Sequence, residues 1–435
     1  MSLMNNSKYY LSYLHNDLIN NNYNYKDIYN VVKKNINNDK LDEYIIDNIK
    51  KLRNYNNNIE KNYIIEELKN KNKYEYYPWV QYNIDNKKNI SFNDFLYEYH
   101  TNLDFQDDIN EKYNDKYNKI INKYDIDKEL KILLKMFNEF YFISLDIKLY
   151  SLNNIDRLLY IKTDIFTLKL YYENNIYNDK IKDIYNKINI IIKLIKNIKK
   201  NNRYLNIFII LSPIKKNIYD NNKILSPYNV NSGLSSINKD ILCIWRYEDL
   251  FKVLIHELIH YYDLDIKKDN KIDNILNISL GNNNYPIYIN EAITELLAIF
   301  YHSIFITYYI DYSNLLKSFK TLLLYEIMFS WLQLYKISKH YNISSFNNFF
   351  NNNLFNQTSN VFSYYIIKCF YTIDIINNIY AINYNCSINK CNHIIKLTKN
   401  IDNNPDNFIQ LYNNFINSNI QFNDNNIKLI LFDIL

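Results

Sequence analysis

The chain has 435 residues, a formal net charge of +5, 48% hydrophobic residues and 22% charged residues. That length is enough for two or three domains, and the balance of residue types is that of a globular protein, which excludes a wholly disordered chain. With 2 glycines, 5 prolines and 4 cysteines, the chain is neither collagen-like nor a disulfide scaffold.

The first 128 residues are predicted to form a helical region of unknown role. Their apolar residues recur at helical spacing over 42–52 and 59–68, among many polar residues. No pattern in this region indicates a chemical site.

From about residue 130 the sequence changes to short apolar runs between amphipathic segments. Runs rich in Ile, Phe, Thr and Tyr predict strands over 140–149, 160–172, 204–211 and 241–246. Ile and Leu at helical spacing predict helices over 179–200, 248–263, 287–310, 313–340 and 360–382. These elements predict an α+β fold in three regions: helical 1–128, mixed 129–285 and helical 286–435.

The location expected from the sequence is the cytoplasm. Residues 1–14 lack a basic region followed by an apolar run, so we expect no signal peptide. Polar residues interrupt the most apolar stretch, 292–310, so we expect a buried helix there and no membrane partner. The modest charge contains no dense Lys/Arg tract, so we expect no nucleic-acid partner either.

One segment carries a metal-binding pattern, His256-Glu257-Leu258-Ile259-His260, inside the helix predicted over 248–263. Histidines four residues apart on a helix project from one face, where both imidazoles can bind a single zinc ion. Glu257 lies beside the open coordination position, where it can take a proton from a bound water.

A third ligand is expected downstream, at Glu291. Glu291 and Glu295 share one face of a predicted helix whose flanking residues are apolar. Two buried acids on one face are costly unless a cation lies between or beside them. Asp263 and Asp265 are alternative ligands in principle, but they follow His260 too closely to reach round the ion.

The combination of H-E-x-x-H with Asn290–Glu295 (NEAITE) resembles the gluzincin metallopeptidases, the thermolysin-like group. The resemblance covers roughly residues 204–300, with Glu295 where those enzymes usually carry Asp. It implies a zincin-like catalytic domain, in which 129–285 forms a small mixed sheet with the active-site helix and 286–435 supplies the third ligand.

Residue roles follow from this resemblance. His256, His260 and Glu291 would bind one Zn²⁺ per chain, with Glu257 as general base. Glu295 would hydrogen-bond the far nitrogen of His256. The remaining implied roles are support of the other ligand helix by Asn290 and binding of an extended polypeptide substrate along an edge strand at Ser232, Gly233 and Leu234.

The donor that stabilises the oxyanion of a peptide substrate is left open by the sequence. The candidates are His302, Tyr262 and Tyr288, together with Tyr261, His340 and His393. The AT-rich codon composition, visible as 46 tyrosines and abundant Asn, and the local pattern resemble metallopeptidase-like proteins of large DNA viruses. That resemblance implies a place in the host cytoplasm or the virion.

The metal-binding pattern has other interpretations. Metzincins are excluded because Asp263 stands at their Gly position and Ile266 at their last ligand position. Cys386, Cys391 and His393 make a poor structural zinc cluster. Two alternatives to a peptidase remain: a catalytically inactive zincin-fold scaffold, and a zinc hydrolase that acts on a non-peptide amide or ester. The oligomeric state is unknown.

Overall fold

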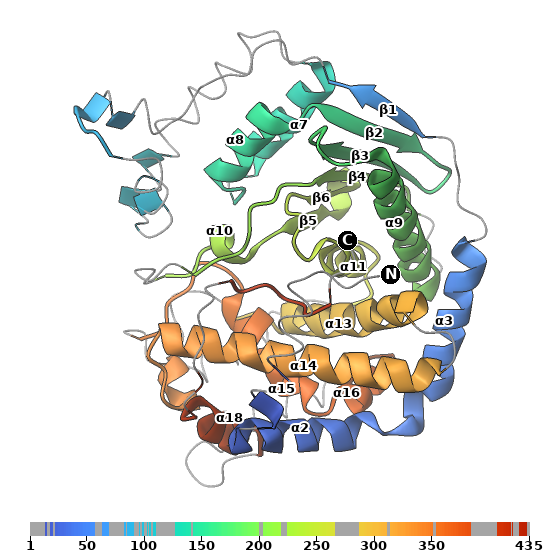
Figure 1. Ribbon diagram of the computed structural model, residues 1–435, viewed down its shortest axis with the longest axis vertical. Helices are drawn as coiled ribbons and strands as arrows, with labels where there is room; N and C mark the ends of the chain where they lie inside the picture. The colour runs from blue at the N-terminus through green and yellow to red at the C-terminus, as the bar shows by residue number, and fades with distance from the viewer. Residues whose placement is uncertain are drawn as a thin grey trace. The chain divides into compact units, whose positions relative to one another are not determined.

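Figure 1 shows the computed structural model of the chain. The structure describes residues 22–56, 63–68, 127–140, 142–199, 203–218, 224–265, 287–310, 314–350, 354–383, 407–418 and 426–432, with scattered positions in 14–20 and 82–109 and residue 420. It is a mixed α+β structure, as predicted.

The chain divides by compactness into two units. Unit 1 comprises Met1–Ile59, Ile184–Asn202 and Asp249–Leu435, and unit 2 comprises Glu60–Asp183 and Arg203–Glu248. The division into regions 1–128, 129–285 and 286–435 stays a prediction. The boundaries of the compact units differ from those of the three regions, because Met1–Ile59 belongs to the same unit as the C-terminal helices.

Unit 2 contains a six-stranded mixed sheet in the order β1-β2-β3-β4-β6-β5. Its strands are β1 (Ile64–Glu67), β2 (Arg157–Lys162), β3 (Phe166–Tyr172), β4 (Leu205–Ile210), β5 (Gly233–Ser236) and β6 (Ile241–Ile244). The central strands β3, β4 and β6 run parallel, whereas β1, β2 and β5 pair antiparallel with their neighbours. β5 is therefore an edge strand, with Gly233 opposite Ile244.

Two helices pack against this sheet, α7 (Lys128–Glu139) and α8 (Leu145–Asn154). Leu133 and Phe137 of α7 and Ile147 of α8 share one buried apolar cluster with Leu158 and Trp245. Unit 2 also holds the short helices α10 (Pro227–Val230) and η3 (Ile237–Lys239).

Three predictions of secondary structure in this unit differ from the structure. The strand predicted over 140–149 is wrong because residues 145–149 form the first half of α8, which buries residues on most of its sides and so hides the helical period. The helix predicted over 59–68 contains β1, whose backbone pairs with β2. The run 160–172 contains two antiparallel strands, β2 and β3, rather than one.

Unit 1 is helical. Its elements are α2 (Tyr23–Ile36), η2 (Asp39–Leu41), α3 (Asp42–Asn56), α11 (Leu250–Tyr261), α13 (Ile289–Ile310), α14 (Leu315–His340), η4 (Phe346–Phe350), η5 (Phe362–Ile367), α15 (Lys368–Thr372), α16 (Ile375–Asn383) and α18 (Asn407–Ile416). The boundary between the units falls within α9 (Asn178–Lys199).

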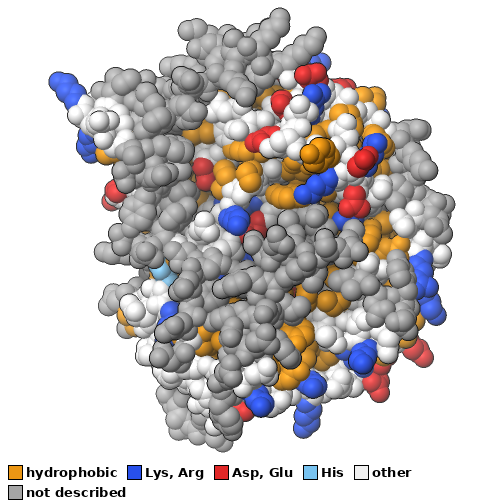
Figure 2. Space-filling model, in the orientation of Figure 1, with side chains coloured by type: hydrophobic (Ala, Val, Ile, Leu, Met, Phe, Trp, Pro, Cys, Tyr) orange, Lys and Arg blue, Asp and Glu red, His pale blue; other side chains and the backbone are white. Residues whose placement is uncertain are grey.

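The centre of unit 1 is α13, against which α3, α11, α14, η5 and α15 pack. Among the described residues, α13 is the one helix long and apolar enough to cross a membrane by length and composition, and 89% of that stretch is buried inside the structure. Such burial is typical of a core helix. On the face seen in Figure 2, the described basic and acidic side chains are interspersed.

Candidate metal centre

The first two candidate ligands lie on α11, and the end of this helix shapes the site. Its last turn closes with a Schellman motif, in which Leu264 N donates to Ile259 O at 2.9 Å and Asp263 N donates to His260 O at 3.1 Å. Asp263 adopts the left-handed conformation (φ 52°) that this motif requires. The chain therefore turns back at once, which brings Asp265 alongside His260.

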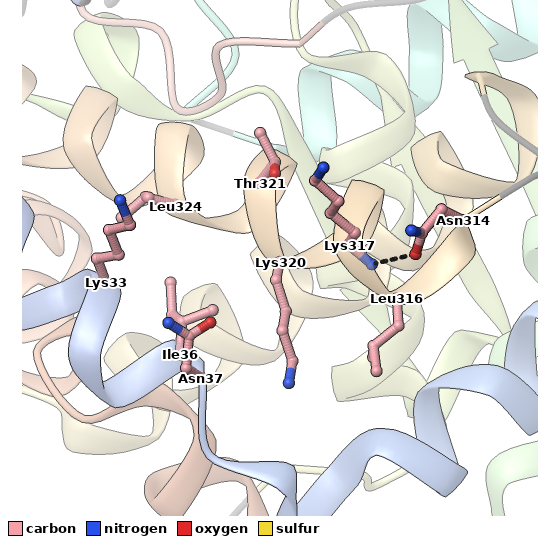
Figure 3. A pocket seen from close by; sticks show the side chains of 9 residues that line it. All are labelled: Lys33, Ile36, Asn37, Asn314, Leu316, Lys317, Lys320, Thr321 and Leu324. Carbon is pink, nitrogen blue, oxygen red and sulfur yellow. Dashed lines mark hydrogen bonds between the residues drawn. The ribbon is translucent and has the colours of Figure 1, made fainter.

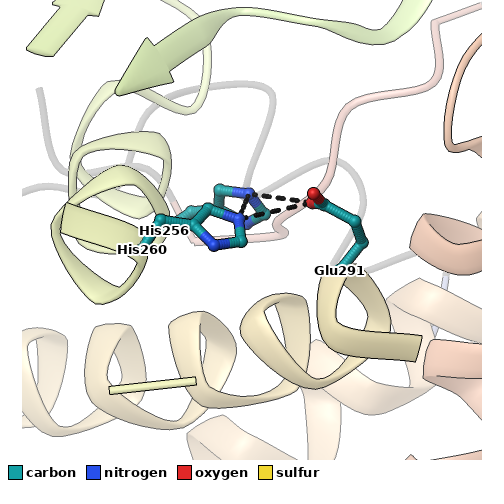
Figure 4. A group of neighbouring side chains, drawn as sticks. All are labelled: His256, His260 and Glu291. Carbon is teal, nitrogen blue, oxygen red and sulfur yellow. Dashed lines mark hydrogen bonds and ion pairs between the residues drawn. The ribbon is translucent and has the colours of Figure 1, made fainter. Parts of the chain in front are cut away.

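Three side chains converge from α11 and α13 (Figure 4). Nε2 of His256 lies 3.2 Å from Nε2 of His260. Oε2 of Glu291 lies 3.6 Å from the first of these nitrogens and 3.3 Å from the second. The spacing within α11 and the packing of α13 against it thus bring together the three residues predicted as ligands.

The size of this triangle suits a small metal ion. A tetrahedral zinc ion with bonds of about 2.0–2.1 Å holds neighbouring ligand atoms about 3.3 Å apart. The three measured edges, 3.2, 3.3 and 3.6 Å, lie close to that spacing. Two imidazoles and one carboxylate are also a donor set that binds zinc and leaves a coordination position for water.

Both histidines face a carboxylate with their other ring nitrogen. Nδ1 of His260 lies 2.8 Å from Oδ2 of Asp265, and Nδ1 of His256 lies 2.8 Å from Oε1 of Glu295. These contacts favour the tautomer with the proton on Nδ1, which directs both Nε2 lone pairs at the carboxylate of Glu291. Three electron-rich atoms that face one another need a proton or a cation between them.

The protonation of the cluster reflects this need. Burial disfavours an imidazolium at His256, but contacts with Glu291 and Glu295 outweigh it and raise its pKa. At His260, burial also lowers the pKa, but contacts with Asp265 and Glu291 outweigh burial and hold the pKa well above its usual range. Burial alone would raise the pKa of Glu291, yet the two histidines lower it. Because metal ligands must be deprotonated, a metal ion at this site would compete with protons.

The predicted general base, Glu257, is buried on the same helix and is one of the acids near His260 and Tyr364. Tyr364, on the π-helical η5, was not singled out from the sequence. Its ring lies 6.0 Å from that of His256. Burial, and after it the charge of Glu291, holds the pKa of Tyr364 well above its usual range, so its hydroxyl stays protonated.

The predicted support of the other ligand helix by Asn290 stays a prediction, and the far nitrogen of His260 lies beside Asp265. Among the described residues, the side-chain oxygen of Asn290 has no hydrogen-bond partner. Asp265 faces Nδ1, the ring nitrogen turned away from Glu291, and so does not take the place of the third ligand.

The candidate oxyanion donors lie in different surroundings. Burial raises the pKa of Tyr262 to about 12, and its ring packs against Tyr261. Tyr288 is half-buried directly before α13. His302 is fully buried, and burial lowers its pKa to about 3 although the charge of Asp249 opposes this shift.

Several other predicted residues belong to unit 2 or lie outside the described residues. Ser232 is buried directly before β5, and Gly233 and Leu234 begin that edge strand. The pairing of β5 is consistent with the predicted strand, whereas its use by a substrate stays a prediction. Cys386, Cys391 and His393 lie outside the described residues.

A separate cavity of about 420 Å³ lies between α2 and the start of α14 (Figure 3). Its walls carry Lys33, Lys317 and Lys320 around an apolar floor that includes Ile36 and Leu324. None of its lining residues belongs to the metal cluster or to the predicted substrate strand.

Three residues around the cluster were missed by the sequence reasoning, Lys252, Tyr364 and Lys368, and Asp265 was considered only as an alternative ligand and not as a partner of His260. Only Lys252 had a signal, because it precedes His256 by four residues and therefore shares its helix face. Asp265 depends on the turn after α11, and Tyr364 is one of 46 tyrosines. No protein-family model, curated protein or solved structure matches the chain, so a function has to be inferred from the residues of this site.

Proposed function

We propose that the protein is a zinc-dependent metallopeptidase with a zincin-like catalytic core. The observation that carries the proposal is the triangle of His256, His260 and Glu291, whose edges are 3.2–3.6 Å and whose two histidines each face a carboxylate at Nδ1. A structural zinc site would have four protein ligands, whereas the cluster formed by the described residues has three, which leaves a position for water.

His256, His260 and Glu291 would hold the ion. When bound, zinc would make a water molecule more acidic and polarise the scissile carbonyl. Glu257 accepts a proton from the attacking water and passes it to the leaving amine. Tyr364 donates its hydroxyl proton in a hydrogen bond to the developing oxyanion, because its high pKa keeps it protonated.

The polypeptide substrate would lie along the edge strand β5, at Gly233 and Leu234. An edge strand offers unpaired backbone groups to which an extended peptide can add as a further strand. Backbone recognition of this kind suits a peptide better than a small amide or ester, which lacks a repeating backbone.

Elemental analysis of the purified full chain tests the metal first. We expect about one zinc ion per chain in the wild type, and none in His256→Ala. The Glu257→Gln variant is the matched control, since it keeps the three ligands and should keep its zinc.

Hydrolysis of a fluorogenic peptide library then tests the activity. We expect cleavage by the wild type that stops on chelation, and a loss of about 10²–10⁴-fold in Glu257→Gln. Stoichiometric zinc without cleavage of any peptide would reject the peptidase and favour the inactive scaffold. Cleavage of esters alone would favour the non-peptide hydrolase.

A further inference from the structure

A buried cluster of charge lies behind His256. It joins three helices of unit 1: Lys252 comes from α11, Glu295 from α13 and Lys368 from the start of α15. The side chains of both lysines are 0% exposed and that of Glu295 is 2% exposed. No solvent therefore shares in balancing these charges.

The two oxygens of Glu295 have different partners. Oε1 forms a close ion pair with Nζ of Lys252 and also lies 2.8 Å from Nδ1 of His256. Oε2 lies 4.0 Å from Nζ of Lys368, which itself lies over the ring of Tyr365. A single oxygen thus meets both a lysine and the far nitrogen of a candidate ligand.

Both lysines reach the carboxyl group of Glu295, one at each oxygen. The oxygen that pairs with Lys252 is also the one that lies 2.8 Å from Nδ1 of His256. A carboxyl group fixed beside the far nitrogen of a metal-binding histidine orients its ring.

We propose that Lys252 and Lys368 are positioning residues that hold the carboxyl group of Glu295 in place beside Nδ1 of His256. They thereby raise the affinity of the site for its metal ion without contacting that ion. The inference rests on the proposed metal site and adds two residues that the H-E-x-x-H pattern does not contain.

A purely structural role for the ion pair of Lys252 with Glu295 predicts a different result. The pair would stabilise the packing of α11 on α13, and its loss would lower the stability of the fold while leaving metal affinity unchanged. If Lys252 instead acts through Glu295, its substitution should change metal affinity only while the carboxylate of Glu295 is present. The two possibilities therefore separate in a double-mutant cycle.

The test measures zinc affinity of the full chain by competition with a chromophoric chelator. We expect binding to weaken about 10–100-fold in Lys252→Met, as for the loss of other groups that orient a metal-binding histidine. Lys252→Arg should restore it. In the Glu295→Gln background, Lys252→Met should cause no further loss. Lys336→Met is the matched control, because Lys336 is also buried in unit 1 but bonds the Asn426 carbonyl oxygen.

The absorption spectrum of the Co²⁺-loaded protein gives a second readout, which should change in Lys252→Met and not in Lys336→Met. If Lys252→Met does not fold, Lys368→Met carries the same expectation of weaker binding. Unchanged or tighter zinc binding in the folded lysine variants would overturn the inference while the metal site stands. A wild type that binds no zinc would reject the metal site, and the inference with it.

Discussion

His302 is a buried group whose charge state the structure fixes, and its replacement tests that reading of the core. It lies on α13, is fully buried, and neither ring nitrogen has a hydrogen-bond partner among the described residues. Burial lowers its pKa from 6.5 to about 3. The folded protein therefore keeps this ring neutral at pH values where the unfolded chain protonates it.

The sign and size of the effect follow from proton linkage. As the pH falls below 6.5, the unfolded chain binds a proton that the folded chain does not, so the free energy of unfolding falls until the pH nears 3. Between pH 7 and pH 5, His302 alone should lower that free energy by about 2 kcal/mol. Above pH 7 it should contribute almost no pH dependence.

Urea unfolding of the metal-free wild type and of His302→Gln, at pH 7 and at pH 5, measures this contribution. The wild type should lose about 2 kcal/mol more than the variant over this interval, and other titrating groups cancel in the difference. Equal losses in the two proteins would show that His302 is charged or solvated in the fold. A kcat unchanged in the variant would also exclude His302 as the oxyanion donor.

Three further substitutions test the site and the scaffold. Asp265→Asn should weaken zinc binding about 10–100-fold, because it removes the carboxylate 2.8 Å from Nδ1 of His260; equal affinity in a chelator competition would contradict this. Tyr364→Phe should lower kcat for peptides about 10²–10³-fold with zinc content and KM retained, and a normal kcat would move the donor role elsewhere. Arg246→Lys should lower the free energy of unfolding by about 3 kcal/mol in urea titrations, since Arg246 is buried and donates to carbonyl oxygens at four positions; an unchanged midpoint would refute its structural role.

The long helices could be predicted because each carries a one-sided or continuous apolar pattern over many turns. Helices predicted over 179–200, 287–310 and 313–340 match α9, α13 and α14 within two residues. Predictions of short elements were wrong where tertiary packing determines the secondary structure. The segment 140–149 has β-forming residues, but burial of α8 beneath the sheet selects a helix, and β1 exists only through its pairing with β2.

The candidate ligands could be predicted because their geometry is local. The spacing of His256 and His260 fixes their common face, and Glu291 lies one turn from Glu295 on a second apolar helix. The groups that orient the ligands were harder to find. Asp265 reaches His260 only through the left-handed turn at Asp263, a conformation that non-glycine residues seldom adopt.

The buried lysines could not be predicted by the same reasoning, because a lysine is normally read as a mark of the solvent side of a helix. Lys252 follows Leu250 and Phe251 in a helix that is buried nearly all round, and Lys368 begins a helix of only 5 residues. Their role emerges only when α13 places Glu295 between them.

The central position of α13 has a consequence for how the protein responds to damage. The helix that packs against α3, α11, α14, η5 and α15 also bears Glu291 at its first turn, so repacking of its distant end would displace that candidate ligand. Loss of the metal ion would then report damage to the core of unit 1. A bound cation would in return stabilise this helical unit against heat and proteolysis by mass action.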